Sequence, residues 1–270
     1  MRWVFLCLAT AAFALAQDAK EIIRRSVQRD LLNFERLKDY TYIEHDRQKS
    51  FDKHNQLKKT ETATYEIMIL GGHDYEKLIE RDDKPLSAKD AAKEQAKLDK
   101  EVERRKHESD AEKAKIEKQR REQRKFLDEI PDEFNFTLLD VETVSGKPAW
   151  VISADPKPDY QPKARGAKLI AKMRGKVWID QAEYQWVKIE AVATGKLSYG
   201  FGLLKIDPGA SVEFEQTRVN DEVWLPAHAS IRLDGRAGLL FGIHDEIDMQ
   251  FRDYRKFQAQ SQLILGAEAK

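Results

Sequence analysis

The sequence predicts a mainly β protein with helices. We expect about eleven strands in a curved antiparallel sheet or open half-barrel, covered by an N-terminal helix and carrying a long charged helical insertion. Three observations predict this fold class. Apolar and polar residues alternate through most of the chain. The alternating segments are joined by short turns such as "SGK", "ATG" and "DPG". Strands and helices do not alternate, so the sequence favours antiparallel over parallel pairing.

The N-terminus has the pattern of a cleavable secretory signal. Arg2 is followed by an apolar run from Trp3 to Phe13, which is too short to cross a bilayer, and Ala14-Leu15-Ala16 fits a cleavage site. We expect residues 1–16 to be removed and the mature chain to begin at Gln17. Cys7, the single cysteine, would leave with the signal, so no disulfide or cysteine metal site is expected.

The mature chain begins with a predicted helix and three predicted strands. Asp18–Leu37 places apolar residues on one stripe at helical spacing. Tyr40–Phe51 and Leu57–Leu70 flank the polar turn "DKHNQ" and predict a hairpin. Gly71-Gly72 then separates a third short strand, Tyr75–Arg81.

Residues 86–130 form the charged insertion within a single domain that spans residues 17–270. No Gly or Pro occurs in this segment, and 24 of the 38 residues of Ala88–Lys125 are charged, 14 basic and 10 acidic. Ser87 with Asp90 resembles a capping box, so we expect one long helix or two. Apolar residues do not keep a heptad spacing, which disfavours a coiled coil. The segment is either a solvated arm or a surface that binds a partner.

Eight more strands are predicted after Pro131. The loop "DPKPDYQPKARG" and a short helix, Ala167–Met173, lie between the second and third of them. The expected strands are Asn135–Val144, Pro148–Ala154, Lys176–Asp180, Tyr184–Ala191, Lys196–Ile206, Ala210–Val219, Glu222–Leu233 and Gly242–Tyr254.

The hairpin "RGKVWIDQAEYQWVKIEA" divides its side chains between two faces. Strict alternation predicts an apolar face that points to the interior, formed by Val177, Ile179, Val187, Ile189 and Ala191. It also predicts that Trp178, Tyr184 and Trp186 lie on the outer or rim side, packed under a loop or available to a partner.

Motifs of known catalytic or nucleotide-binding chemistry are missing from the sequence. There is no GxxxxGK[ST], GxGxxG after a strand, HExxH or GxSxG, so we expect neither an enzyme nor a cofactor. Alternation places His244, Glu246 and Asp248 together, which fits a solvated strand face better than a metal site. Lys+Arg and Asp+Glu both total 47, so no net charge favours nucleic acid.

Several predicted strands have one fully apolar face, which must be covered. Few helices are available, so the sheet either encloses a cavity for a lipid or acyl chain or is filled by its own side chains. We expect the cavity, if present, to be lined by Tyr65, Ile67, Ile69, Val177, Ile179, Val187, Ile189, Leu225, Ile231, Leu233, Ile247, Met249 and Phe251.

A helix followed by about eleven antiparallel strands resembles the LolA/LolB-type periplasmic lipoprotein carriers. "GKVWIDQAEYQWVKIEA" is similar to a hairpin common in that superfamily, and "VNDEVWLPAHASI" to a later strand. "DYEKLIERDDKPLSAKDAAKEQAKL" resembles an uncharacterised bacterial branch of lipoprotein-sorting-like proteins, whereas the carriers lack so long a charged insertion. The resemblance implies a periplasmic protein that binds lipid, carries lipoproteins or senses envelope stress.

The sequence thus leaves three functional hypotheses. The first is a non-catalytic periplasmic module that binds lipid or lipoprotein acyl chains. The second is an envelope interaction or scaffold protein whose charged arm meets a protein partner while its core is closed. The third is an enzyme whose site no motif reveals. Under the first two, we expect a monomer without nucleic acid, cofactor or transmembrane anchor.

Overall fold

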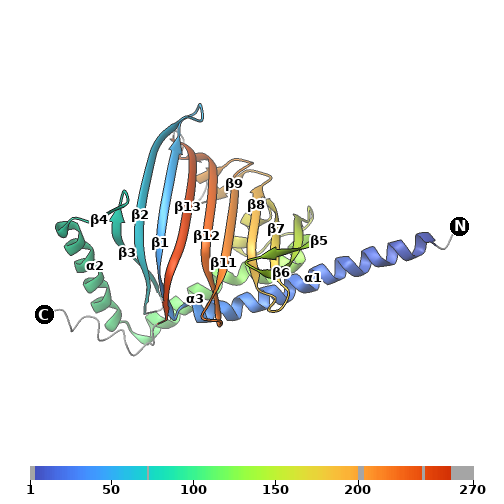
Figure 1. The fold of residues 1–270 in the computed structure, drawn as a ribbon, viewed down its shortest axis with the longest axis horizontal. Coiled ribbons are helices and arrows are strands. Elements are labelled where there is room, and N and C mark those ends of the chain that lie inside the picture. Colours follow the sequence, from blue (N-terminus) through green and yellow to red (C-terminus); the bar gives the residue numbers. More distant parts are fainter. Residues whose placement is uncertain (1–3, 72, 200–203, 239–240, 257–270) are drawn as a thin grey trace.

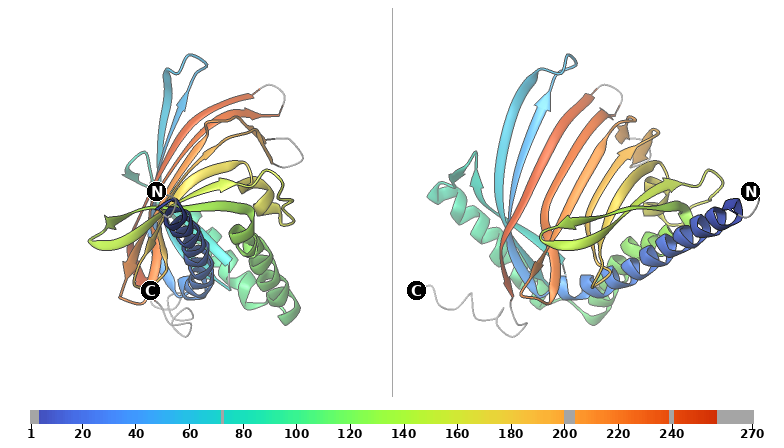
Figure 2. Two further views of the ribbon diagram at one scale, coloured as in Figure 1. Left: turned by 90° about the vertical axis from the view of Figure 1, so that its right-hand side faces the viewer. Right: turned by 45° about the vertical axis from the view of Figure 1, so that its right-hand side comes forward.

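The computed structural model describes residues 4–71, 73–199, 204–238 and 241–256. Its strands form one antiparallel sheet whose main path has the order β4-β3-β2-β1-β13-β12-β11-β8-β7-β6-β5, with β9 and β10 beside β12. Figure 2 shows the sheet curving around the side on which the helices lie. The curved antiparallel sheet with helices that the sequence predicts is confirmed. The strands are β1 Tyr40–Phe51, β2 Leu57–Leu70, β3 His73–Arg81, β4 Lys84–Pro85, β5 Phe134–Val144, β6 Lys147–Pro156, β7 Met173–Asp180, β8 Trp186–Ala193, β9 Leu197–Tyr199, β10 Leu204–Ile206, β11 Ser211–Val219, β12 Val223–Ala237 and β13 Phe241–Lys256.

The N-terminal helix α1, Val4–Leu37, packs on one face of the sheet. Ile22 and Ile23 are buried in a cluster with Phe136, Ile152 and Ile179 from β5, β6 and β7. α1 therefore covers the β5–β8 end of this face, which we call the concave face, and its C-terminal part reaches the start of β12, where Asn33 forms hydrogen bonds with the Trp224 backbone. The N-terminal part of α1 extends beyond the sheet (Figure 1).

A buried carboxylate joins α1 to two distant segments. Asp30 is 4% exposed. It forms an ion pair with Arg124 and accepts a hydrogen bond of 2.7 Å from Nε1 of Trp186. Gln185 Nε2 donates to the same carboxylate at 3.3 Å. Because a buried charge is stable only when it is paired and hydrogen-bonded, this contact fixes α1 against the start of β8 and the end of the insertion.

The charged insertion forms two helices, α2 Ala88–Lys106 and α3 Asp110–Arg124. Ser87 caps α2 as the sequence predicts, and a capping box of Ser109 and Glu112 starts α3 after a break at residues 107–109. Both helices are described along their whole length, and neither has a buried residue. The predicted helical insertion is confirmed, and the insertion lies at the periphery of the sheet.

Both ends of the insertion are anchored. Near the start of α2, Gln95 accepts a hydrogen bond of 2.8 Å from Lys77 on β3. At the end of α3, the guanidinium groups of Arg120 and Arg124 lie 4.8 and 4.1 Å from the centre of the Phe34 ring. After α3 the chain continues through a 3-10 helix, η1 Lys125–Asp128, and a short helix, α4 Ile130–Glu133, into β5.

Several predicted boundaries are wrong. The short helix α5 spans Arg165–Ile170, and β7 already begins at Met173, where the sequence predicts the helix to end. Lys196–Ile206 is not one strand, because β9 and β10 pair with each other as a small hairpin. The brief strand β4 was not expected. The errors at α5 and β7 lie at element ends, where local turn geometry decides the boundary.

Candidate functional site

One row of side chains crosses the concave face of nearly the whole sheet. Residues paired across neighbouring strands point to the same face, so the register defines the row strand by strand. It is apolar from β5 to β13 and changes character at β1, where the paired residue is a carboxylate. The row consists of Leu138, Ile152, Val177, Ile189, Phe214, Ala229, Met249, Asp46, Ala63 and Arg81.

A second row lies beside the first and repeats the pattern. Ala191 pairs with Val212, Val212 with Ile231, and Ile231 with Ile247, which pairs in turn with Gln48 on β1. Ile189, Ile231, Ile247 and Met249 are half-buried, and they lie outside the buried clusters that α1 and the loops cover. The middle of the concave face is thus apolar and only partly covered.

The structure places most of the predicted cavity residues on this face. Tyr65, Ile67 and Ile69 reach it on β2, Val177 and Ile179 on β7, and Ile189 on β8. Ile231 and Leu233 on β12 alternate with outward residues, as do Ile247, Met249 and Phe251 on β13. Of these, Ile67, Ile69 and Ile179 are buried and the others are half-buried.

A β-bulge in β8 places two side chains on the opposite faces from those that strict alternation predicts. Trp178 pairs with Lys188 but Ile179 pairs with Trp186, which leaves Val187 as the extra residue. Trp186 therefore lies on the concave face, packed against the α1 cluster and 5.2 Å from the Phe214 ring. Val187 is buried with Trp178 on the opposite face. The predictions that Val187 points inward and that Trp186 points outward are both wrong.

Two more assignments need correction. Tyr184, expected on the outer side, packs against the α1 cluster, and the Arg25 guanidinium lies 5.1 Å from its ring centre. A second bulge, between Glu215 and Gln216 of β11, breaks the alternation of β12. Leu225 is therefore separated from Ile231 and Leu233 and is fully buried with Tyr40 and Val223. Trp178 lies on the outer face, as predicted.

An acidic pair on β1 borders the apolar rows. Glu44 pairs with Phe251 and Tyr65, and Asp46 with Met249 and Ala63, so both carboxyl groups lie on the concave face. Burial, and next the neighbouring Asp46 carboxylate, raise the pKa of Glu44 to about 7. Burial also raises the pKa of Asp46. Sequence alternation could not reveal this pair as an interior feature, because polar residues in a strand normally indicate its solvent face.

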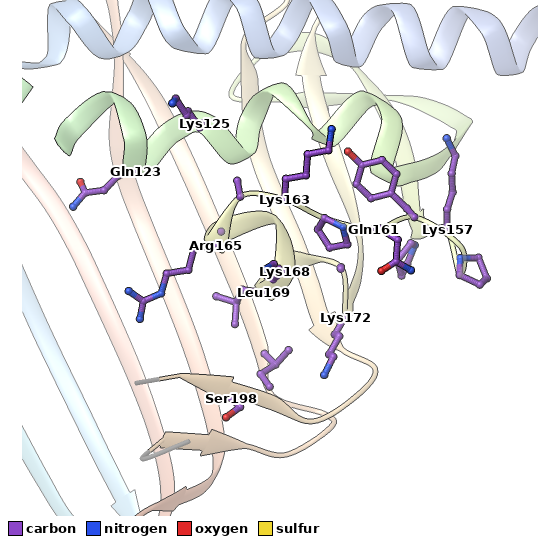
Figure 3. Close-up of a pocket in the computed structure, with 18 of the residues that line it drawn as sticks. Gln123, Lys125, Lys157, Gln161, Lys163, Arg165, Lys168, Leu169, Lys172 and Ser198 are labelled. Carbon is purple, nitrogen blue, oxygen red and sulfur yellow. The ribbon is translucent and has the colours of Figure 1, made fainter. Parts of the chain in front are cut away.

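A basic pocket lies at the opposite end of the concave side, around α5 (Figure 3). It is an open pocket of about 1600 Å³ between the proline-rich loop, α5, the end of α3 and β9. Six basic side chains and one carboxylate, that of Glu122, line it. The basic residues are Lys125, Lys157, Lys163, Arg165, Lys168 and Lys172.

Glu129 holds the loop that forms one wall of the pocket. Its carboxylate accepts hydrogen bonds from the backbone amides of Lys163 and Ala164, at 2.9 and 2.6 Å, and from the Tyr160 hydroxyl at 3.1 Å. Burial opposes ionisation, but these donors more than offset it, so the pKa of Glu129 is lowered. Gly166 fits because a side chain there would come within 2.8 Å of the Phe126 ring. The wall is therefore rigidly positioned.

The sequence interpretation missed this pocket. The signal was present, since residues 156–172 contain five basic residues and one acidic residue, Asp159. The proline spacing indicated only a loop, and the contribution of Lys125 from the distant insertion could not be foreseen.

The candidate metal ligands on β13 contact side chains of β12 rather than one another. These candidates are His244, Glu246 and Asp248. His244 Nδ1 lies 2.9 Å from Asp234, His228 Nε2 lies 2.7 Å from Asp248, and Arg232 lies 3.9 Å from Glu246. Within the described ranges, no three His, Cys, Asp or Glu side chains gather as metal ligands would. In the same part of the chain, no helix is long and apolar enough to cross a membrane.

Among known proteins, only solved structures were found to be similar to this chain. No family model and no curated protein matches the chain. A domain described as an outer membrane lipoprotein-sorting protein, from Vibrio parahaemolyticus, is 10% identical, with 88% of this chain and 96% of that chain covered and a TM-score of 0.33. A LolA superfamily protein from Nitrosomonas europaea is 9% identical, with 90% and 96% covered and a TM-score of 0.34.

A third similar structure is a DUF1329 family protein from Desulfovibrio piger. It is 11% identical, with 94% of this chain and 99% of that chain covered and a TM-score of 0.36. The chain is thus structurally similar to LolA superfamily, lipoprotein-sorting and DUF1329 proteins, at low sequence identity.

Proposed function

We propose that the protein is a non-catalytic binding protein of the cell envelope that holds the acyl chain of a lipid or lipoprotein against its concave face. One observation carries the proposal: the apolar rows continue from β8 across β11, β12 and β13, past the cluster in which α1 is buried. A folded domain gains free energy when such a surface is covered. An extended hydrocarbon chain fits a row of half-buried aliphatic side chains without needing polar contacts.

The free energies favour a long chain over a short one. Each methylene removed from water contributes about 0.8 kcal/mol, whereas association costs at least about 4 kcal/mol. Micromolar affinity corresponds to about 8 kcal/mol, so roughly 15 buried methylenes are needed. Acyl chains of membrane lipids have about this length, and smaller apolar metabolites do not.

The proposal includes export to the periplasm and a single binding domain. In this scheme residues 1–16 direct secretion and are removed, and residues 17–270 form one domain with residues 86–130 as a peripheral insertion.

Uptake of a fluorescent fatty acid tests the proposal. Ile189 is half-buried on the concave face, whereas Val192, three residues further on β8, points the other way and is 38% exposed. Ile189→Asp should abolish uptake because a carboxylate replaces apolar contact surface, and Val192→Asp should leave it unchanged. Both variants should stay folded, as judged by melting temperature.

The results that would refute the proposal are specific. Wild-type protein that takes up no probe, together with an Ile189→Asp variant that fails to fold, would mean that side chains fill the space. The alternative hypothesis of an interaction protein with a closed core would then apply.

A further inference from the structure

The basic pocket has an excess of positive charge on the concave side of the molecule. Six basic side chains line it against one carboxylate, and the Lys125 ammonium already lies 2.5 Å from that Glu122 carboxylate. Like charges gathered around one open pocket repel one another, and a bound anion relieves this repulsion. The electrostatic preference of the pocket is therefore for an anionic ligand.

Four lysines of the pocket take part in no ion pair within the described residues. Lys157 donates a hydrogen bond of 2.8 Å to the backbone carbonyl of Asp132, and Lys172 one of 2.9 Å to that of Lys196. These contacts orient each ammonium group without cancelling its charge. Lys163 and Lys168 take part in no ion pair within the described part of the chain, and both border the pocket in Figure 3.

The pocket is continuous with the apolar surface. Leu169 and Leu197 line the pocket and pack with Leu233 in one cluster. Leu233 lies two residues from Ile231 on the same face of β12, and Ile231 belongs to the second apolar row. A ligand with a charged end in the pocket could therefore extend directly along the concave face.

The other end of the apolar rows has carboxyl groups instead of basic groups. There, Glu44 and Asp46 replace the apolar side chains on β1, and they would repel an anionic group once ionised, which for Glu44, whose pKa is raised, requires a pH above about 7. The concave face thus runs from a basic end at α5 to an acidic end at β1, with apolar rows between them. This charge difference would fix the direction in which an elongated ligand lies.

We infer that the ligand is an anionic amphiphile. Its carboxylate or phosphate headgroup lies among Lys163, Lys168 and the other basic residues of the pocket, and its hydrocarbon chain runs past Leu233 onto the apolar rows. This inference rests on the proposed function, because it assigns a headgroup to the chain that the concave face holds.

Two matched probes on the full-length protein test the inference. A fluorescent fatty acid and its neutral methyl ester carry the same chain, so only the headgroup differs. Wild-type protein should bind the acid about tenfold more tightly, since two or three partly solvated charge contacts contribute about 1.4 kcal/mol together. Lys163→Gln/Lys168→Gln should remove this preference. Lys89→Gln/Lys100→Gln, on exposed positions of α2, should retain it.

Two further results separate the possible failures. Equal binding of acid and ester by wild-type protein, abolished by Ile189→Asp, would overturn the headgroup assignment and leave the proposed function intact. No binding of either probe would overturn both. Inorganic phosphate should not displace the acid at concentrations where unlabelled fatty acid does. Equally effective displacement by phosphate would overturn the inference, because the pocket would then recognise an anion without its chain.

Discussion

The buried carboxyl group of Glu133 predicts that the protein loses stability as the pH rises. Glu133 is 1% exposed, and neither of its side-chain oxygens has a hydrogen-bond partner among the described residues. Burial, and next the nearby Glu129 carboxylate, raise the pKa of Glu133 from 4.5 to about 7. The folded protein thus holds a proton that the unfolded chain releases near pH 4.5.

The sign and size of the effect follow from linkage. Between about pH 4.5 and 7 the folded state binds more protons than the unfolded state, so stability falls as the pH rises. Each unit of pKa difference corresponds to about 1.4 kcal/mol, so Glu133 costs at most about 3 kcal/mol above pH 7. Below pH 4.5 both states are protonated at this carboxyl group, and the cost disappears.

Urea unfolding of Glu133→Gln at several pH values measures this cost. The variant should be up to about 3 kcal/mol more stable than wild type at pH 8, with a much smaller difference at pH 4.5. Asp132→Asn is the control, because Asp132 is exposed, pairs with Lys20 at 2.7 Å and has a lowered pKa. Removing that carboxylate should not stabilise the protein at pH 8. A Glu133→Gln variant with the same difference from wild type at both pH values would refute the reasoning.

Three other predictions concern the core, the insertion and the N-terminus. Asp30→Ala should destabilise the protein by about 3 kcal/mol in urea unfolding, because it leaves Arg124 and Trp186 without their buried acceptor; a loss below about 1 kcal/mol would contradict the structural role of Asp30. Replacing residues 88–118 with a short linker, which keeps Arg124, should change stability by less than about 2 kcal/mol, and global unfolding would show that α2 belongs to the core. N-terminal sequencing of the exported protein should begin at Gln17, and an intact Met1 in a cytoplasmic pool would argue against the signal.

Alternation predicted the sheet well because each strand buries one face. It placed Ile189, Ile231 and Ile247 correctly, since each lies in a stretch of regular pairing that no bulge interrupts. It failed at Val187 and Leu225, which adjoin bulges. One extra residue in a strand reverses every later side chain, and no single-sequence signal identifies which residue is extra. The face of a strand is therefore predictable only as far as the next bulge.

The charged features of the candidate site depend on long-range pairing, which composition does not reveal. Glu44 and Asp46 become interior residues because β13 lies beside β1. The basic pocket combines Lys125 with a loop more than 30 residues away along the sequence. In both places the charged residues can be seen in the local sequence, but the order of the strands in the sheet determines which side chains surround them.

The position of β13 has a consequence for how the chain assembles. β13, the last strand that the structure describes, lies between β1 and β12, and it pairs with β1 from Tyr40↔Lys256 to Ser50↔Asp245. Until β13 is available, an emerging chain has two separate sheets with unpaired edges, and such edges readily pair with other chains. Non-local pairing of this kind also folds slowly. The acidic and apolar parts of the concave face are therefore joined only when β13 inserts between β1 and β12. A chain truncated before β13 should form its binding surface only when β13 is added as a separate peptide.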